Sequence, residues 1–359
     1  MTAELGVSVD DTGSATDPEA LYREAIVIDA HDHALDEAFW RSRDRSAIEF
    51  LTAPHAEGIT AAIFACCLPS TAALGTTPAA QKYPLLVFLQ MVRLLYEKLE
   101  EVGNTLMLAT CAADIEEAKK AGKTAVILGL EDAGPTQGGD LFVLRMLHKL
   151  GLRHVLLAHE GRNNIATSSS MYDGKDIRAY DPALSGPGGL TPQGKRFVRE
   201  MNRLGIIIDV SHLSDHSVWD VLEVSEKPVI ASHSNTRTFP DMADTWKCLR
   251  NPTDEQIVAL AKKGGVIGAT GCVIGGKGKH PTLKDLFDRI DYLVELAGAD
   301  HVGLGTDSAI GRIVPLDSQE PIGTIHEVAT GLLARGHNPE NVKKILGGNF
   351  MRVLKEIMG

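Results

Sequence analysis

The sequence predicts an α/β protein, a single-domain (β/α)8 barrel of the TIM type built from 359 residues. Short apolar runs rich in β-branched residues alternate with amphipathic stretches of helical spacing, a pattern typical of βαβ units and a parallel sheet. Eight such units over this length favour a closed barrel over an open doubly wound sheet. An open sheet would also be expected to place a glycine-rich loop after its first strand, where this chain has His31-Asp32-His33.

The predicted strands are short apolar runs bounded by polar or glycine-containing loops. In chain order they are Ala25–Asp29, Ile59–Cys66, Thr124–Leu130, Arg153–Ala158, Gly205–Val210, Pro228–Ala231, Gly265–Ala269 and His301–Gly305. The stretches between them carry apolar residues at helical spacing. The main predicted helices are Leu85–Glu101, Ile115–Ala121, Leu141–Leu150, Thr191–Leu204, Asp254–Lys263 and Leu283–Leu296. A further apolar run, Thr105–Ala109, is expected to be a short extra or edge strand.

Composition and charge narrow the class of protein. The chain is 44% hydrophobic and 23% charged, which is ordinary for a globular protein. Its formal net charge of −11 argues against a nucleic-acid partner, which would require a basic surface. No apolar run approaches the ~20 residues that span a membrane, so we expect no membrane association. We expect a polar N-terminal segment at residues 1–20, without the features of a secretory signal, followed by the barrel at 21–359.

The five cysteines show no paired spacing, and their odd number argues against a disulfide framework. Adjacent Cys66 and Cys67 lie in an apolar run and are interpreted as small buried hydrophobic residues. These features predict a reducing, cytoplasmic location. A homodimer is inferred only by analogy with other barrels.

Polar side chains follow six of the predicted strands. They are His31 and His33, Glu131, His159, His212, His233 and Asp307. In a barrel the C-terminal ends of all strands share one face, and that face holds the active site. We therefore expect these side chains, which are far apart in sequence, to converge at one mouth.

The residue types in this set suit a pair of metal ions. Imidazoles and carboxylates bind Zn²⁺ or similar ions, whereas sites for hard cations use oxygen ligands alone. His31 and His33 are two apart on a strand, so both side chains point to the same face. Glu131 can bridge two ions with its two oxygens, and ions about 3.5–4 Å apart can hold a hydroxide and polarise a carbonyl. The sequence thus predicts two divalent ions, with zinc as the first choice.

Each histidine also has a simpler interpretation, because one histidine at a strand end is more often a capped or surface residue than a ligand. His216, four after His212, is an alternative ligand if both lie on one helix face. Asp209 is interpreted as facing the barrel interior beside the ligands. The other histidines, His55, His148, His154, His280, His301, His326 and His337, fall in predicted helices or loops without converging partners. The glycine-rich stretch from Gly271 to Lys277 lacks the Ser or Thr of a phosphate-binding loop and is expected to be a flexible active-site loop.

At these positions the chain resembles the renal (membrane) dipeptidase family of the amidohydrolase superfamily, from Ile28 to about Leu354. The resemblance rests on short segments in a fixed order and spacing. They are Ile28-Asp29-Ala30-His31, Gly129-Leu130-Glu131, Leu157-Ala158-His159 with Asn163 and Asn164, Ile208-Asp209-Val210-Ser211-His212, Ala231-Ser232-His233-Ser234-Asn235, Arg250-Asn251, Gly303-Leu304-Gly305-Thr306-Asp307 and Gly347-Gly348-Asn349-Phe350-Met351-Arg352-Val353.

The resemblance implies a set of metal ligands. His31 and His33 would hold one ion and His212 and His233 the other, with Glu131 bridging both.

The resemblance also implies the catalytic roles in a zinc-dependent dipeptidase that attacks an amide with a metal-bridging hydroxide. His159 would contact the oxygen of the scissile group. Arg250 would pair with the C-terminal carboxylate of the substrate, for which its forked guanidinium is suited. Asp307 would accept the proton and return it to the leaving amine.

Two departures from the family pattern bear on the substrate. The family usually has Asp two residues after the first His, where this chain has His33, and the residues after Asp307 lack the usual aromatic and acidic side chains. Other amidohydrolase activities therefore stay open, such as an N-acyl amino acid deacylase or a lactonase. A non-catalytic metal-binding barrel is a further alternative, although it would not need Asp307. A solvent-facing Arg250 before a helix capped by Asn251 or Thr253 is the alternative to carboxylate binding.

Overall fold

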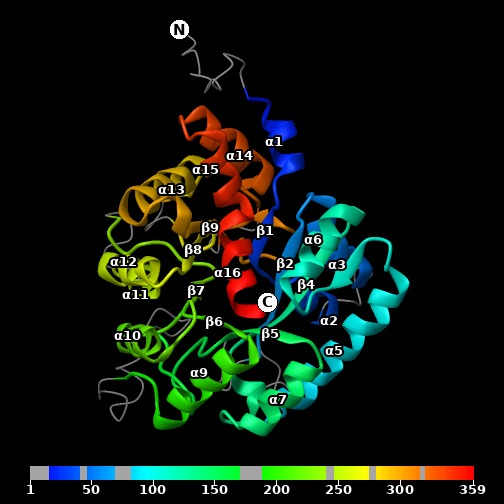
Figure 1. Cartoon of the computed structure of the whole chain (residues 1–359), viewed down its shortest axis with the longest axis vertical. Helices are drawn as coiled ribbons and strands as arrows, with labels where there is room; N and C mark the ends of the chain where they lie inside the picture. Colours follow the sequence, from blue (N-terminus) through cyan, green and yellow to red (C-terminus); the bar gives the residue numbers. More distant parts are fainter. Residues whose placement is uncertain are drawn as a thin grey trace.

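The computed structural model describes residues 16–40, 47–68, 82–169, 188–239, 246–274, 280–315 and 320–359. Eight parallel strands follow one another around a barrel in the order β1-β2-β4-β5-β6-β7-β8-β9 (Figure 1). Their bounds are β1 Ile28–Asp32, β2 Ala61–Cys66, β4 Thr124–Glu131, β5 Leu152–Leu156, β6 Ile207–Asp209, β7 Ile230–Ala231, β8 Val266–Ala269 and β9 Val302–Leu304. The predicted (β/α)8 barrel is confirmed.

Helices surround the strands (Figure 1). Their bounds are α1 Pro18–Glu24, α2 Ala34–Trp40, α3 Ala47–Ala56, α5 Pro84–Glu101, α6 Ala112–Ala121, α7 Leu141–Lys149, α9 Pro192–Leu204, α10 Asp215–Val224, α11 Trp246–Arg250, α12 Asp254–Lys262, α13 Leu283–Ala297, α14 Ile325–Ala334, α15 Pro339–Lys343 and α16 Asn349–Met358. Short 3-10 turns lie at Gly134–Thr136 and Ala299–His301. The helices begin where the sequence supplies caps: the Thr253 side chain accepts from the backbone N–H of Gln256 and starts α12.

The barrel closes where the chain after β9 meets β1. Ser308 forms a parallel bridge to Asp32. The backbone N–H of Asp307 donates to the carbonyl of His31 at 2.9 Å, and that of His33 donates to the carbonyl of Ser308 at 3.0 Å. This seam joins the first and last strands beside His31, His33 and Asp307, which the sequence predicts to be site residues.

Apolar side chains fill one end of the barrel interior. Small and branched residues of the strands, such as Ala30, Ile63 and Ile127, pack against α16, whose Phe350 is buried among them. Gly303 on β9 leaves room for this ring, because a Cβ there would lie 2.3 Å from the Phe350 side chain. Figure 1 shows α16 lying across the centre of the ring of strands. The apolar plug leaves the opposite, C-terminal ends of the strands for polar groups.

The structure differs from the sequence prediction mainly in short elements. The strand predicted at Ala25–Asp29 lies at Ile28–Asp32, so His31 is inside β1 and does not follow it. The run predicted as an extra strand is β3 Leu106–Leu108, which pairs with β4 outside the ring, as expected. A small sheet of β10 Arg312–Ile313 and β11 Gly323–Thr324 was not predicted.

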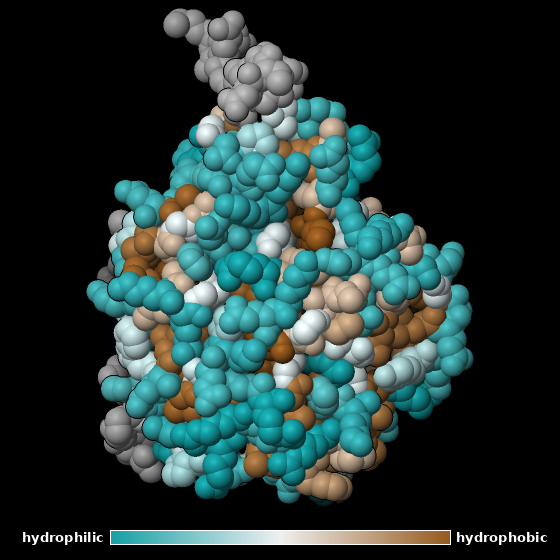
Figure 2. Space-filling view, viewed as in Figure 1, coloured by the Kyte–Doolittle hydropathy of each residue, from teal (hydrophilic) through white to brown (hydrophobic). Residues whose placement is uncertain are grey.

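Of the predicted N-terminal polar segment, residues 1–15 lie outside the described residues, and α1 begins at Pro18. The face of the molecule that carries α16 is mostly hydrophilic, with apolar side chains in small scattered groups (Figure 2). Within the described ranges, no helix has the length and apolar character needed to cross a membrane.

Candidate metal centre

Four imidazoles converge on one carboxylate oxygen at the C-terminal mouth of the barrel. Glu131, the last residue of β4, is buried, and its Oε1 atom is the common point. The Nε2 atoms around Oε1 lie at 3.3 Å for His31, 3.4 Å for His212, 3.6 Å for His159 and 3.6 Å for His233. These side chains come from the ends of β1, β4, β5, β6 and β7, as a barrel mouth requires.

The second oxygen of Glu131 faces a different pair of side chains. His33 Nε2 lies 3.6 Å from Glu131 Oε2 and 3.1 Å from Asp307 Oδ1. His31 Nε2 lies 3.9 Å from the same Asp307 oxygen. The carboxylate of Glu131 therefore lies between two groups of donors.

Among the described residues, three potential metal-binding groups share Glu131. One contains His31, His33, Glu131 and Asp307, a second contains Glu131, His212 and His233, and a third contains Cys67, Glu131 and His159. Within each group the ligand atoms lie within 4.8 Å of one another. Two groups with one common carboxylate are what a bridged pair of ions needs. All the predicted site residues except Arg250 belong to this convergence, His159 included.

The details of the centre fit bound cations. His31 Nε2 is buried without a hydrogen-bond partner, and an unpartnered buried nitrogen is costly unless something binds it. The Nε2 atoms of His212 and His233 lie 3.0 Å apart, which points their lone pairs at one shared region. A donor set made mostly of imidazole nitrogens, with carboxylate oxygens, is one that zinc and similar ions prefer.

The protonation of three candidate ligands, His212, His233 and Glu131, agrees with this fit. Burial, with help from the positive charge of Arg250, lowers the pKa of His212 to about 3. Burial and the neighbouring His31 also hold the pKa of His233 well below its usual value. Burial raises the pKa of Glu131, but the imidazoles of His159 and His31 outweigh this effect and leave it well below the usual value. Neutral imidazoles and an ionised carboxylate are the forms that bind metal.

The backbone is strained at two site residues. His212 has φ 65° and Asp307 has φ 55°, in the left-handed region that few residues other than glycine adopt. Such a conformation costs of order 1–3 kcal/mol and persists where the surroundings enforce it. The carbonyl of His212 accepts from the N–H of Ser169 at 2.6 Å, and the N–H of Asp307 is used in the barrel seam. The strain therefore directs both side chains into the mouth.

His159 is held in the loop after β5 by a buried acidic side chain. Its backbone N–H donates to Asp132 Oδ2 at 3.0 Å. The amide of Asn163 contacts Asp132 and donates to the carbonyl of Leu157 at 2.7 Å. This network holds the loop, and the imidazole of His159 lies 3.6 Å from Glu131 Oε1.

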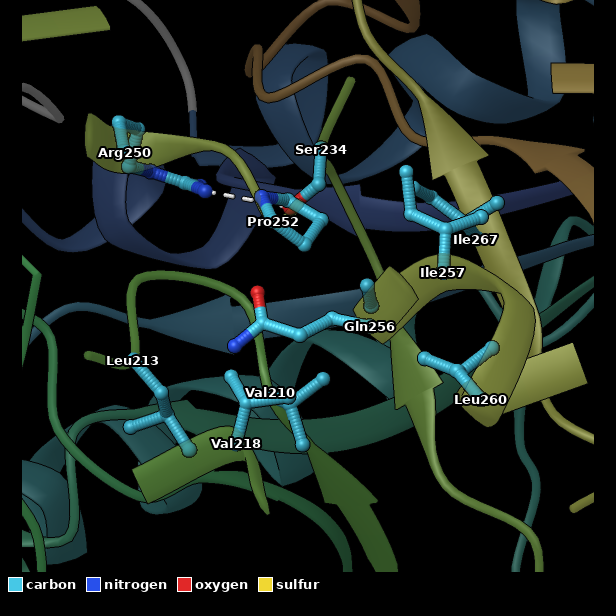
Figure 3. Close-up of a pocket in the computed structure, with 11 residues that line it drawn as sticks. Val210, Leu213, Val218, Ser234, Arg250, Pro252, Gln256, Ile257, Leu260 and Ile267 are labelled. Atoms are coloured by element: carbon cyan, nitrogen blue, oxygen red, sulfur yellow. Dashed lines mark hydrogen bonds between the residues drawn. The ribbon is translucent and has the colours of Figure 1, made fainter. Parts of the chain in front are cut away.

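Arg250, the last residue of α11, is only 2% exposed. The alternative of a solvent-facing arginine is therefore wrong, although Thr253 does cap α12, as that alternative supposed. Its guanidinium donates to Ser234 Oγ at 3.2 Å and to the carbonyl of His233 at 2.9 Å, and its Nε has no hydrogen-bond partner. Figure 3 shows the guanidinium directed toward Ser234, beside an enclosed cavity of about 10 Å³. Such a cavity is about large enough for one water molecule.

Sequence reasoning missed several residues around the centre. His154 was placed among histidines without partners, but it is buried on β5 and its Nε2 lies 3.0 Å from Asp209 Oδ2. Asp36 was not considered, yet its Oδ2 lies 2.9 Å from His33 Nδ1. The Asp209 carboxylate faces the interior, as expected. One feature that could have indicated a buried His154 is Gly129 on the adjacent strand, because a Cβ there would lie 2.7 Å from the His154 ring.

The interpretation of the adjacent cysteines is half wrong. Cys66 is fully buried, but Cys67 is partly exposed and its Sγ lies 3.9 Å from His159 Nδ1. The strand ends at Cys66, so the next residue turns toward the mouth. Both are free thiols.

Two further sequence interpretations fall outside the centre. His216 is exposed on α10 and belongs to none of the potential metal-binding groups among the described residues, so it is not the alternative ligand. The expected flexible loop from Gly271 to Lys277 is described only as far as Ile274, which is buried, and its remainder lies outside the described residues.

The chain belongs to the membrane dipeptidase family, peptidase family M19, whose family model matches residues 17–358. It is 32% identical over 271 residues to dipeptidase tcpJ of Claviceps purpurea (strain 20.1). That match covers 75% of this chain and 59% of the Claviceps protein, so the chain spans about three fifths of the length of that relative.

Two solved structures show the same fold. An amidohydrolase from Pseudomonas aeruginosa has a TM-score of 0.74 at 23% identity, with 96% of this chain and 100% of that chain covered. A metallo peptidase from Rhodobacter sphaeroides, liganded with a phosphinate mimic of the dipeptide L-Ala-D-Ala, has a TM-score of 0.73 at 23% identity, with 93% and 100% covered.

Proposed function

We propose that this protein hydrolyses the amide bond of small dipeptides with the help of two divalent ions, for which zinc suits the ligands. The observation that carries the proposal is the convergence of four imidazole nitrogens at 3.3–3.6 Å from one oxygen of Glu131. Membership of the membrane dipeptidase family and the dipeptidase name of the Claviceps relative support the substrate class.

The metal-holding roles follow the two ligand groups. His31 and His33 would hold one ion, His212 and His233 would hold the other, and Glu131 would be the ligand common to both. When bound, such ions polarise a carbonyl and lower the pKa of water toward about 7.

Asp307 is the proposed proton carrier. Burial raises the pKa of its carboxyl, but the hydrogen bond and charge of His33 outweigh burial and lower the pKa to about 2. The group is therefore an acceptor at neutral pH. Its side chain is 17% exposed, so it lies at the rim, where it can take a proton from water and pass it to the leaving amine.

His159 and Arg250 are the proposed substrate contacts. Burial lowers the pKa of His159. The neutral ring can donate a hydrogen bond to the oxygen of the scissile group as negative charge develops there. Arg250 supplies a fixed positive charge next to the imidazoles, suited to the C-terminal carboxylate of a dipeptide.

The proposal is tested by purifying the protein without chelator, measuring its metal content, and assaying dipeptides, N-acyl amino acids and lactones side by side. We expect about two divalent ions per chain and a clear preference for dipeptides. Preferred turnover of N-acyl amino acids or lactones would replace the substrate class while keeping the metal-dependent hydrolase. No metal and no activity after adding Zn²⁺, Mn²⁺ or Co²⁺ would contradict both parts.

The cytoplasmic location and the homodimer expected from the sequence stay predictions. Cell fractionation and light scattering of the purified protein test them.

A further inference from the structure

One buried hydroxyl touches a ligand from each half of the centre. Ser232 Oγ lies 3.1 Å from His31 Nδ1 and 2.8 Å from His233 Nδ1. The two rings are stacked, with centroids 3.7 Å apart and planes inclined by 35°, so a single atom can reach both Nδ1 atoms. His31 belongs to the potential metal-binding group that contains His33, and His233 to the group that contains His212; the two also share a further group with Asp209.

The hydrogen-bonding capacity of this hydroxyl is fully used. A serine hydroxyl has one proton to donate and two lone pairs to accept with. Ser232 donates its proton to Asp209 Oδ2. Its two lone pairs then face three groups, the two Nδ1 atoms at 2.8 and 3.1 Å and the Ser211 hydroxyl at 3.5 Å. The imidazoles are the closer partners, so each is placed to donate from Nδ1.

The Asp209 carboxylate is itself fixed as an acceptor. Its Oδ1 accepts from the backbone N–H of Ser211 at 2.9 Å and of Ser232 at 3.0 Å. Its Oδ2 faces the Ser232 hydroxyl and the Nε2 of His154, 3.0 Å away. Two backbone donors on Oδ1 prevent the carboxylate from turning, so Oδ2 stays directed at Ser232.

The Ser232 backbone has no room to shift. A Cβ on Gly268 would lie 2.0 Å from the Ser232 carbonyl oxygen, and one on Gly305 would lie 2.1 Å from it. Glycine on β8 and just after β9 lets the chain after β7 pack this closely. The backbone that carries the hydroxyl is therefore closely packed against these two segments.

We propose that Ser232 is a positioning residue that fixes the tautomer of one imidazole ligand in each half of the centre. With hydrogen on both Nδ1 atoms, His31 and His233 keep their Nε2 lone pairs toward Glu131 and the ions. His33 is oriented differently, by its own carboxylate Asp36 at 2.9 Å. The role in metal binding rests on the proposed function, whereas the tautomers are a property of the protein alone.

The tautomers are measured directly by ¹⁵N NMR of the histidine-labelled, metal-free protein. We expect His31 and His233 to carry hydrogen on Nδ1 in the wild type and to show mixed tautomers in Ser232→Ala. Ser225→Ala is the matched control, because Ser225 is also buried and donates to the carbonyl of Lys227 at 2.8 Å. Unchanged His31 and His233 signals in a folded Ser232→Ala would overturn the proposal.

Asp209→Asn tests the same point without removing volume. The two backbone donors on Oδ1 require the amide oxygen of Asn to take that place, which leaves its NH₂ group facing Ser232. The serine must then accept from the amide and direct its proton at one imidazole. We expect His31 or His233 to move its hydrogen to Nε2, and no change in either ring would contradict the proposed orientation.

Metal binding distinguishes a hydroxyl that supports ligands of both ions from one that supports a ligand of a single ion. Loss of a group that orients a ligand typically weakens metal binding by about 10–100-fold. In Zn²⁺ titrations of metal-free protein, we expect Ser232→Ala to weaken both equivalents, whereas Asp36→Asn weakens only the one held by His33. Weakening of one equivalent alone in Ser232→Ala would show that the hydroxyl supports a single site.

The activity assay separates this inference from the proposed function. If the wild type binds no dipeptide but Ser232→Ala still alters both tautomers, the dipeptidase assignment fails and the positioning role stands. If the wild type is an active dipeptidase and the tautomers do not change, the positioning role fails alone.

Discussion

At the level of single residues, the ligand that departs from the family pattern has its own acidic partner. His33 replaces the usual Asp, which removes one negative charge from the centre. Burial lowers the pKa of His33, but hydrogen bonds to Asp307 and Asp36 outweigh it and raise the pKa well above its usual value. Positive charge is therefore favoured at this point, and a bound cation can supply it in place of the proton.

We predict that Asp307→Asn keeps the metal and loses most of the activity. The amide preserves the shape and the barrel seam, which uses backbone atoms of Asp307, but it cannot accept a proton. A general acid–base group is typically worth ~10²–10⁴-fold in rate. Metal analysis and kcat on the best substrate check this together. Activity within a few-fold of the wild type would mean that another group carries the proton.

We predict that Arg250→Ala removes the preference for substrates with a free carboxylate. Charge-assisted bonds to a buried arginine are stronger than those of exposed ion pairs. The measurement compares kcat/KM for a dipeptide and its C-terminal amide in both proteins. The wild type should favour the acid.

An unchanged acid-to-amide ratio would show that Arg250 has only a structural role through Ser234 and the carbonyl of His233. Arg237→Ala is the matched control. Arg237 pairs with Asp215 on α10, and its loss should leave the ratio unchanged.

The convergence of the candidate ligands was predictable because a barrel gathers the ends of its strands at one mouth, so a polar residue after an apolar run is expected to lie there. Ser232 and His154 were not predictable in this way. Serine next to a ligand and histidine within a strand are common, and their roles depend on Asp209, which reaches them across neighbouring strands. The left-handed backbone of His212 was likewise not predictable, because only a few per cent of residues other than glycine adopt it.

At the level of elements, we predict that Phe350→Ala destabilises the fold without changing the ligands of the centre. The ring is 1% exposed and plugs the end of the barrel opposite the mouth. Removing a buried phenylalanine costs about 3–5 kcal/mol. Phe142→Ala on α7, where the ring is 69% exposed, is the control and should change stability by less than about 0.5 kcal/mol. Denaturant unfolding of both variants measures the difference in stability. Equal midpoints would contradict the prediction that packing of Phe350 stabilises this end of the barrel.

The long helices were predicted well because one face of each is buried, so apolar residues recur along it at helical spacing. The helices from Pro84 to Glu101 and from Leu283 to Ala297 match closely. Short elements in the loops, such as α2 and the β10–β11 pair, have too few residues to show a clear period. Their formation depends on contacts with other elements, as α2 contacts both α3 and β2.

At the level of the whole molecule, we predict that removing metal lowers the unfolding temperature. The centre joins side chains from six strand ends, and among them His31 Nε2 is buried without a hydrogen-bond partner, which a bound ion would supply. A ligand that binds only the folded state stabilises it by about 2.7 kcal/mol at 100 times its Kd. Calorimetry before and after chelation, with Zn²⁺ added back, measures this effect. An identical transition in all three states would exclude tight binding at the centre.

The barrel seam also sets the order in which the protein can mature. Asp307 and His33 are 274 positions apart in the chain, and backbone bonds beside them close the ring. All five imidazoles of the centre precede the last strand in the chain. The group that contains Asp307 can therefore assemble only after synthesis has passed the last strand. A chain truncated before Asp307 would carry these histidines without the seam that closes the ring around them.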